Sequence, residues 1–378
     1  MIISIPKETE YNETRVAVTA QSVKELIKAG YKVKIQTGAG KKSFISDDTF
    51  KEAGANIVGD STDLYKDSDI TIKVAPPTTE EILLLPKNSI LISFFQPTIE
   101  LKRVKAMIDS KITGLSMHLV PRTTLAQKMD ALSSQANISG YKAVLMGSTH
   151  MSVYMPLLMT AAGTIRPAKV LILGAGVAGL QAIATAKRLG AQVEAFDVRP
   201  EVKEQVESLG AKFVEVLSNS DDGVGEGGYA KETSKEYKQK QEQLIREHIS
   251  KANMVITTAL IPGRKAPILI SRDVVELMKP GSVIMDLAAE NGGNCELTIQ
   301  DKVVFHNDIV IDGTANIPAT MPIHSSELYA KNISALVLYM TKDNKINLDM
   351  DDEIISGSTF THQGEVTHEA TVNILKEG

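Results

Sequence analysis

The chain has 378 residues, of which 43% are hydrophobic and 23% are charged. This is the composition of a folded globular protein, and the length corresponds to about two or three domains. The 41 basic and 46 acidic residues give a net charge of −5, which excludes an overall basic surface of the kind that binds nucleic acid. A single cysteine, Cys295, excludes an internal disulfide and a cysteine-rich zinc site, and fits a reducing compartment.

In the first 120 residues, short apolar runs alternate with segments of helical periodicity. Thr19 is placed to cap a helix that Gly30 ends. Alternating strands and helices predict a mostly parallel sheet with helices on both faces. The expected strands are Ile2–Ile5, Tyr31–Gln36, Ile70–Val74, Ser89–Phe95 and Ile112–Met117, and the further helices are Asp47–Glu52, Thr79–Leu84 and Leu101–Ile108.

Residues 120–165 interrupt this alternation, and we expect them to connect two lobes. They begin with the polar, irregular stretch Pro121–Ser134, after which a long apolar helix or helix pair should end near Gly163. The most apolar part, residues 143–162, contains Pro156 and several polar residues, which argues against a membrane span. The N-terminus lacks the basic start and long apolar run of a targeting segment.

From Lys169 onward the alternation resumes more strongly. The expected strands are Val170–Leu173, Val193–Asp197, Phe213–Val216, Met254–Thr257, Val283–Asp286 and Ile309–Ile311. The expected helices are Gly179–Leu189, Val202–Leu209 and, after a glycine-rich insertion at Ser218–Tyr229, a charged helix at about Thr233–Ser250. The tail, Ser325–Gly378, should begin with a helix and return to the first lobe.

These elements predict an α/β protein with two Rossmann-like, doubly wound lobes, mostly parallel sheets and a cleft between the lobes. Residues 1–133 and 322–378 would form the N-terminal lobe with its returning tail. Residues 134–321 would form a Rossmann domain that binds NAD(H).

One glycine-rich motif carries most of the functional information. Gly174, Gly176 and Gly179 form G-x-G-x-x-G directly after an apolar strand and before a helix, and Asp197 follows Gly174 by 23 residues. Together these features make a dinucleotide fingerprint, in which the glycines permit a tight turn, close approach of pyrophosphate and helix–strand packing. Asp197 would bind a ribose diol and favour NAD(H), although Arg199 nearby is the residue type that accepts a 2′-phosphate.

Several further segments resemble one family. They are Gly174–Lys187, Asp197–Arg199, Gly227–Glu232, Thr257–Gly263, Met285–Asn294 and the series Arg122, Gln127, Asp130 and Ser133–Gln135. Together with the fingerprint they resemble the NAD(H)-binding domain I, or alpha subunit, of proton-translocating nicotinamide nucleotide transhydrogenase, of which alanine dehydrogenase is a relative. The likeness extends over nearly the whole chain.

The resemblance implies an AB-specific transhydrogenase subunit that binds NAD(H) and exchanges hydride directly with NADP(H) on a partner domain. A membrane-spanning partner would couple this transfer to proton translocation. The chain would be a homodimer in the cytoplasm of a bacterium, held at the inner membrane through its partner subunits. No role for nucleic acid or metal follows, since the seven histidines lack metal-ligand spacing.

The resemblance also implies site residues. Arg122, Gln127, Asp130 and Ser133 would position the nicotinamide, with an Arg122–Asp130 charge pair, because direct hydride transfer needs orientation more than acid–base chemistry. Tyr229 would close over the site on a mobile loop. The expected cofactor-binding residues are Gly174, Ala175, Gly176, Val177, Gly179, Asp197, Val198, Arg199, Gly228, Gln241 and Leu260, with Glu290 at the same strand edge.

Two other functions remain open at this stage. An amino- or keto-acid dehydrogenase resembling alanine dehydrogenase is favoured by Arg15 and Lys73, which match its substrate-binding residues. It is opposed by Gln96, which stands where that enzyme has a catalytic histidine, since imine reduction then lacks a proton donor. The third possibility is a non-catalytic NAD-binding regulatory module.

Overall fold

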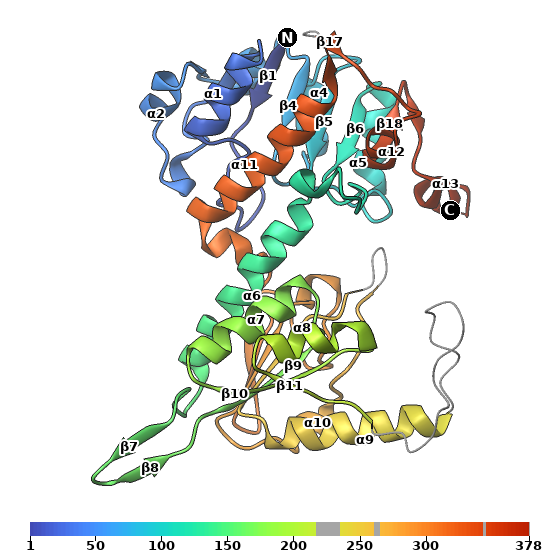
Figure 1. Ribbon diagram of the computed structural model, residues 1–378. Coiled ribbons are helices and arrows are strands. Elements are labelled where there is room, and N and C mark those ends of the chain that lie inside the picture. Colours follow the sequence, from blue (N-terminus) through green and yellow to red (C-terminus); the bar gives the residue numbers. More distant parts are fainter. Residues whose placement is uncertain (217–234, 261–264, 343–344, 378) are drawn as a thin grey trace. The chain divides into compact units, whose positions relative to one another are not determined.

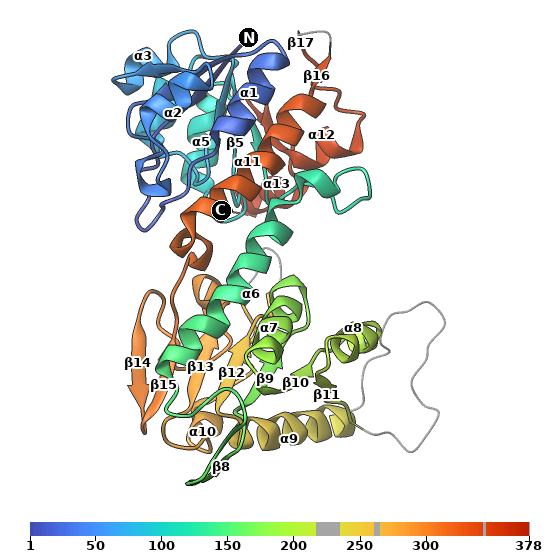
Figure 2. The same cartoon turned by 60° about the vertical axis from the view of Figure 1, so that its left-hand side comes forward.

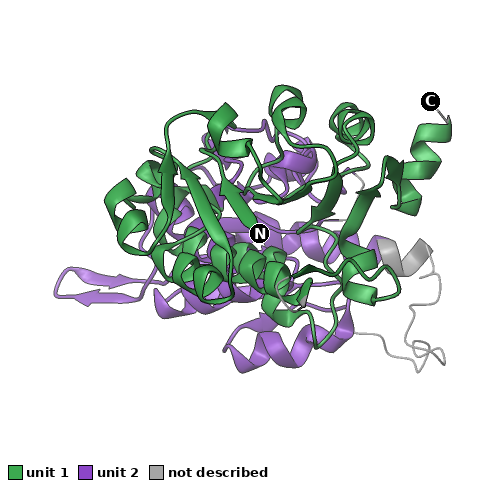
Figure 3. Ribbon diagram, turned by 90° about the horizontal axis from the view of Figure 1, so that it is seen from above, with its two compact units in different colours: residues 1–135, 318–378 green, residues 136–317 purple. Residues whose placement is uncertain are grey.

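The computed structural model describes residues 1–216, 235–260, 265–342 and 345–377. These residues form two compact units (Figure 3). Unit 1 comprises residues 1–135 and 318–378, and unit 2 comprises residues 136–317. Each unit contains its own sheet and its own hydrophobic core.

Unit 1 is built on an eight-stranded sheet in the order β19-β18-β6-β5-β4-β1-β2-β3. The six strands β1 to β6 are parallel, whereas β18 and β19 are antiparallel. The predicted return of the tail is confirmed, because β18 pairs with β6. The strands are β1 (Ile2–Ile5), β2 (Lys32–Gln36), β3 (Asn56–Val58), β4 (Ile70–Ile72), β5 (Ile90–Ser93), β6 (Thr113–Ser116), β18 (Thr359–His362) and β19 (Glu365–Val366).

Helices cover both faces of the unit 1 sheet, as predicted. Helices α1, α2, α11 and α12 pack on one face and α3, α4 and α5 on the other (Figure 1). Thr19 caps α1 as expected, in a reciprocal capping box with Ser22. The helices are α1 (Ala20–Lys28), α2 (Asp47–Glu52), α3 (Ser61–Tyr65), α4 (Thr79–Leu84), α5 (Leu101–Asp109), α11 (Pro322–Tyr339), α12 (Glu353–Ser358) and α13 (Glu369–Glu377), with a small hairpin of β16 (Thr341–Lys342) and β17 (Lys345–Ile346).

Unit 2 is built on a seven-stranded sheet in the order β11-β10-β9-β12-β13-β15-β14, parallel except for the edge strand β14. Helices α6, α7 and α8 contribute to the core on one face, and α9 and α10 to the core on the other (Figure 2). The strands are β9 (Lys169–Leu173), β10 (Gln192–Phe196), β11 (Lys212–Phe213), β12 (Met254–Thr257), β13 (Val283–Asp286), β14 (Val303–His306) and β15 (Ile309–Asp312). The helices are α6 (Ala131–His150), α7 (Val177–Arg188), α8 (Lys203–Ser208), α9 (Lys235–Lys251) and α10 (Arg272–Val275).

The structure corrects the expected helix to Gly163. Helix α6 ends at His150, and the hairpin of β7 (Leu158–Thr160) and β8 (Gly163–Ile165) follows it. Pro156 cannot continue a helix, and Gly163 has a φ of +131°, which suits a tight hairpin and not a helix. The strand expected at Phe213–Val216 is also shorter, because β11 pairs on one side only and ends at Phe213.

Candidate dinucleotide site

The fingerprint lies where the order of strands in unit 2 reverses. From β9 the chain proceeds to β10 and β11 on one side and then crosses to β12 on the other side of β9. In open α/β sheets, ligands bind at such a switch point, at the carboxyl ends of the strands. Gly174 follows β9 and Thr258 follows β12, and the Thr258 hydroxyl donates to the Gly174 carbonyl at 3.0 Å.

The three fingerprint glycines have different steric surroundings. Gly174 has a φ of +105°, and a Cβ there would lie 2.5 Å from Thr258 Oγ1. A Cβ on Gly179 would lie 1.9 Å from the Gly174 carbonyl oxygen, so only glycine lets α7 pack this closely on the turn. A Cβ on Gly176 would have no atom of the described part of the chain within 4 Å, which leaves open space beside the backbone.

Helix α7 begins at Val177, and its N-cap Gly176 supplies no side-chain acceptor. The N–H groups of its first turn are thus available to an anion, which the helix dipole also favours. The preceding N–H, that of Ala175, is instead donated to Asp197 Oδ2 at 2.7 Å. The turn is therefore held in shape by the same aspartate that should recognise the ribose.

Asp197 directly follows β10 and is tied to its own loop. Arg199 donates to it through its backbone N–H at 2.9 Å, through Nε at 3.0 Å and through Nη2 at 2.9 Å. Burial acts to raise the pKa of Asp197, but these hydrogen bonds outweigh it, and the pKa lies below its ordinary value. Val198 is exposed, as is half of the Arg199 side chain.

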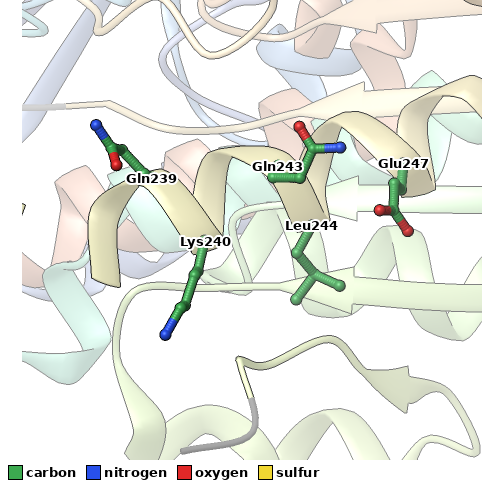
Figure 4. Close-up of a pocket in the computed structure, with 5 residues that line it drawn as sticks. All are labelled: Gln239, Lys240, Gln243, Leu244 and Glu247. Atoms are coloured by element: carbon green, nitrogen blue, oxygen red, sulfur yellow. The ribbon is translucent and has the colours of Figure 1, made fainter. Parts of the chain in front are cut away.

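Two other predicted residues lie on elements of unit 2 that reach this strand edge. Leu260 follows β12 by three residues, and its side chain is 52% exposed. Gln241 is half-buried in the first turns of α9. A shallow depression of about 500 Å³ lies along the same helix (Figure 4), and Gln241 does not line it; the lining residues are Gln239, Lys240, Gln243, Leu244 and Glu247. Gly228 and Tyr229 lie outside the described residues.

The loop predicted to position nicotinamide is anchored in unit 1. Ala126 and Met129 are buried in its core, whereas Arg122 and Gln127 are exposed. Asp130 caps α6, because its oxygens accept from the Ser133 backbone N–H at 2.8 Å and from the Ser133 hydroxyl at 2.6 Å. The predicted Arg122–Asp130 pair is absent from the ion pairs of the described residues, since Asp130 is used as a helix cap.

The residues that suggested a keto-acid site are already paired with carboxylates. Arg15 binds both oxygens of Glu13, with Nε at 2.8 Å and Nη2 at 2.7 Å. Lys73 is 1% exposed, and its Nζ lies 3.0 Å from Glu81 Oε1 and 3.6 Å from Glu8 Oε2. Two internal ion pairs therefore neutralise the charges that a substrate carboxylate would need.

Sequence reasoning missed the polar residues that connect the strand ends of unit 2. Asp286 ends β13 and is 1% exposed, yet it accepts a hydrogen bond from Thr257 Oγ1 at 2.9 Å. Asn294 is fully buried and binds the backbone of Ala259. Their position at the carboxyl ends of predicted strands was the available signal. Glu290, on the same edge, is exposed and accepts the backbone N–H of Asn316.

The two doubly wound sheets and the fingerprint at the switch point define a protein with a Rossmann-like dinucleotide-binding fold. Family models agree: residues 4–139 match the alanine dehydrogenase/PNT N-terminal domain, and residues 143–369 match the alanine dehydrogenase/PNT C-terminal domain. The chain belongs to the alanine dehydrogenase/PNT family.

Within this family the chain is similar to transhydrogenase sequences. It is 45% identical over 371 residues to an NAD(P) transhydrogenase subunit alpha from Cereibacter sphaeroides, and the match covers 97% of this chain and 71% of the relative. It is 43% identical to the first part of an NAD(P) transhydrogenase subunit alpha from Rhodospirillum rubrum, with 98% of each chain covered.

Solved structures give the same result. The crystal structure of a transhydrogenase from Sinorhizobium meliloti matches with a TM-score of 0.88 and 43% identity, over 97% of this chain and 100% of that one. An L-alanine dehydrogenase matches with a TM-score of 0.85 and 25% identity, over 100% and 99%. Among the described residues, no helix has the length and apolar character to cross a membrane, and no histidine, cysteine or carboxylate group forms a metal cluster.

Proposed function

We propose that unit 2 binds NAD(H) and that this chain is the NAD(H)-binding subunit of a proton-translocating transhydrogenase. The observation that carries the proposal is the open backbone at Gly176 beside a carboxylate, Asp197, at the switch point of the sheet. The family membership and the transhydrogenase relatives support it. Residues 134–321 remain our assignment for the NAD(H)-binding domain, and residues 1–133 with 322–378 for the other lobe.

Each predicted residue has a stated task in this proposal. The pyrophosphate would be bound by backbone N–H groups of the fingerprint turn and of the first turn of α7. Asp197 would accept the adenosine ribose hydroxyls, with Val198, Gln241 and Leu260 beside the nucleoside. Gly228 and Tyr229 would complete the site, although the structure does not describe them.

The nicotinamide would be oriented by Arg122, Gln127, Asp130 and Ser133. Bound NADH supplies a hydride, and the protein's contribution is to fix the direction in which the ring faces its acceptor. The exposed side chains of Arg122 and Gln127 are accessible for such a role. The acceptor is NADP⁺ on a partner subunit, and a membrane-spanning partner couples transfer to proton movement, so the chain would be attached to the inner membrane peripherally.

We also propose a homodimer, and the β7–β8 hairpin supports it. The hairpin projects from the rest of unit 2 (Figure 1), and an isolated two-stranded hairpin is marginally stable in water. Its side chains include Met159, which is 72% exposed, Leu157 at 53% and Ile165 at 43%. A second copy that covers this apolar surface would stabilise both. Met159→Asp should shift the mass in solution from dimer to monomer, whereas Leu83→Asp, on exposed α4 of unit 1, should not.

Hydride transfer tests the main proposal directly. Transfer from NADH to a spectrally shifted NADP⁺ analogue is measured with and without an isolated NADP(H)-binding transhydrogenase subunit, and NADH oxidation by pyruvate plus ammonium is measured in parallel. We expect rapid transfer only with the partner. NADH oxidation by pyruvate and ammonium without transfer would support the dehydrogenase instead, and NADH binding without either reaction would indicate a regulatory module. The internal ion pairs of Arg15 and Lys73 count against the dehydrogenase.

A further inference from the structure

The buried Asn294 amide joins two chain segments at the carboxyl edge of the unit 2 sheet. Its Oδ1 accepts the Ala259 N–H at 3.0 Å, and its Nδ2 donates to the carbonyls of Ala259 at 2.9 Å and Pro267 at 2.8 Å. Ala259 and Pro267 lie on either side of a segment that includes residues the structure does not describe. One side chain with no solvent exposure thus holds the backbone on both sides of that segment.

Asn294 is itself held by Asp286. The Asp286 carboxylate accepts the backbone N–H groups of Asn294 at 2.7 Å and Cys295 at 3.0 Å. It also accepts Thr257 Oγ1 at 2.9 Å, so it connects the ends of β12 and β13. A buried carboxylate with this many donors is costly to rearrange, because any lost partner leaves a charge without compensation. The amide therefore occupies one fixed position.

The fixed segment contacts the fingerprint. Thr258 lies between Thr257, which binds Asp286, and Ala259, which binds Asn294. Its hydroxyl donates to the carbonyl of Gly174 in the fingerprint turn. Leu260, the next residue along, presents a half-exposed side chain from this anchored backbone. The position of Leu260 relative to the turn is thus set by Asn294.

We propose that Asn294 is a positioning residue for the dinucleotide: by clamping Ala259 and Pro267, it holds Leu260 and the adjoining backbone against the place where NAD(H) binds. This inference rests on the proposed binding of NAD(H) by unit 2. Without the clamp, the binding free energy of the dinucleotide would have to include the ordering of these segments. Asn294 touches no reacting atom and acts through the segment it holds.

A matched pair of variants tests the proposal in the full chain. Asn294→Ala removes the clamp at the carboxyl edge. Ser282→Ala removes a buried side-chain hydrogen bond to Ala252 at 3.2 Å, which joins the starts of the same two strands at the amino edge. NADH dissociation constants are measured by titration calorimetry, at a temperature where melting curves show every variant to be folded. We expect Asn294→Ala to bind NADH about tenfold more weakly, which corresponds to about 1.4 kcal/mol, and Ser282→Ala to change binding less than about twofold.

Steady-state kinetics with the NADP(H)-binding partner subunit separate positioning from chemistry. The KM for NADH should rise in Asn294→Ala while kcat at saturating NADH stays near that of the wild type, because ordering is completed once the dinucleotide is bound. An unchanged dissociation constant in folded Asn294→Ala would overturn the proposal. An equal loss of NADH affinity in Ser282→Ala would do the same, because the effect would then be general loosening.

Hydrogen exchange on the wild type keeps the proposal testable if Asn294→Ala fails to fold. NADH should slow exchange in residues 254–260 and 265–270 and leave residues 280–283 unchanged. NADH binding without protection of the first two segments would overturn the positioning role and leave the proposed function intact. No NADH binding by the wild type would overturn the proposed function, and the positioning role with it.

Discussion

The guanidinium of Arg199 lies across the carboxylate of Asp197, with Nε 3.0 Å from Oδ1 and Nη2 2.9 Å from Oδ2. Oδ2 also accepts the N–H of Ala175 from the fingerprint turn at 2.7 Å. The acidic group expected to select NAD(H) is therefore fixed by its own neighbours, and one of them is the cation that could bind a 2′-phosphate. The choice of nucleotide depends on which of the two charges faces the ribose.

Asp197→Ser should shift the preference from NADH toward NADPH. The substitution removes the charge that repels a 2′-phosphate and releases the Arg199 guanidinium to bind it. We expect the ratio of the NADPH to the NADH dissociation constant to fall by at least about tenfold, measured by fluorescence titration. The double variant Asp197→Ser/Arg199→Ala is the control, and an equal shift in it would show that Arg199 has no part in the change.

Gly140→Ala should destabilise the protein although it replaces glycine inside helix α6. Alanine in a helix normally stabilises by about 1 kcal/mol relative to glycine. At Gly140, however, a Cβ would lie 2.0 Å from the carbonyl oxygen of Ala178 in α7, so the two helices must separate. We expect the free energy of unfolding in urea to fall by about 1–3 kcal/mol.

The control for this prediction is Gly59→Ala, where nothing in the described part of the chain lies within 4 Å of the added carbon. Its stability should stay within about 0.5 kcal/mol of the wild type. Equal stability of the two variants would show that α6 and α7 can separate without cost.

Lys73→Met should reveal a structural role for the lysine. The buried Nζ lies 3.0 Å from Glu81 and 3.6 Å from Glu8, and its removal leaves Glu8 buried without a cation. We expect a loss of about 3–5 kcal/mol in the free energy of unfolding at pH 7. Burial already raises the pKa of Glu8, so loss of the cation should raise it further. The deficit should therefore grow as the pH rises from about 5 to 8, because the unpaired carboxylate must then ionise.

The control for Lys73→Met is Lys51→Met, which breaks an exposed pair with Asp48 and should cost no more than about 0.5 kcal/mol. A Lys73→Met protein of wild-type stability would contradict the structural role and reopen the keto-acid alternative.

His118 should weaken the fold in mild acid. Burial, and then the nearby charge of Arg15, lowers the pKa of His118 to about 4 in the folded chain, against an ordinary value of 6.5. The unfolded chain therefore binds a proton first, and stability is lost as the pH falls from about 6.5 toward 4. His118→Asn retains an acceptor for the Phe95 N–H, which Nδ1 accepts at 3.1 Å. Its unfolding free energy should fall by about 2 kcal/mol less than that of the wild type over this range.

The matched control for His118→Asn is His324→Asn, since His324 is exposed. Urea unfolding at pH 7, 6, 5 and 4 follows both variants. Parallel curves for His118→Asn and the wild type would contradict a protonation cost at His118.

Local sequence determined many of the elements because their causes lie within a few residues. Thr19 starts α1 through a capping box with Ser22, and β12 and β13 have the predicted bounds of Met254–Thr257 and Val283–Asp286. Fully buried strands of a parallel sheet are continuous apolar runs, which the sequence displays directly. The three-residue β3 carries too short a pattern to recognise, and the apolar run after His150 does not distinguish a buried helix from an exposed hairpin.

The fingerprint could be predicted because its glycines and Asp197 have a defined spacing that reflects one strand–turn–helix–strand unit. Which groups surround it was decided only by tertiary structure. The contact of Thr258 with Gly174 spans 84 residues, and that of Asn294 with Ala259 spans 35. Likewise, the sequence identified Arg15 and Lys73 as cations, but only the fold places Glu13, Glu8 and Glu81 against them. Spacing specifies what one local unit can do, whereas the partners of a buried charge depend on chain segments that meet only when the sheet forms.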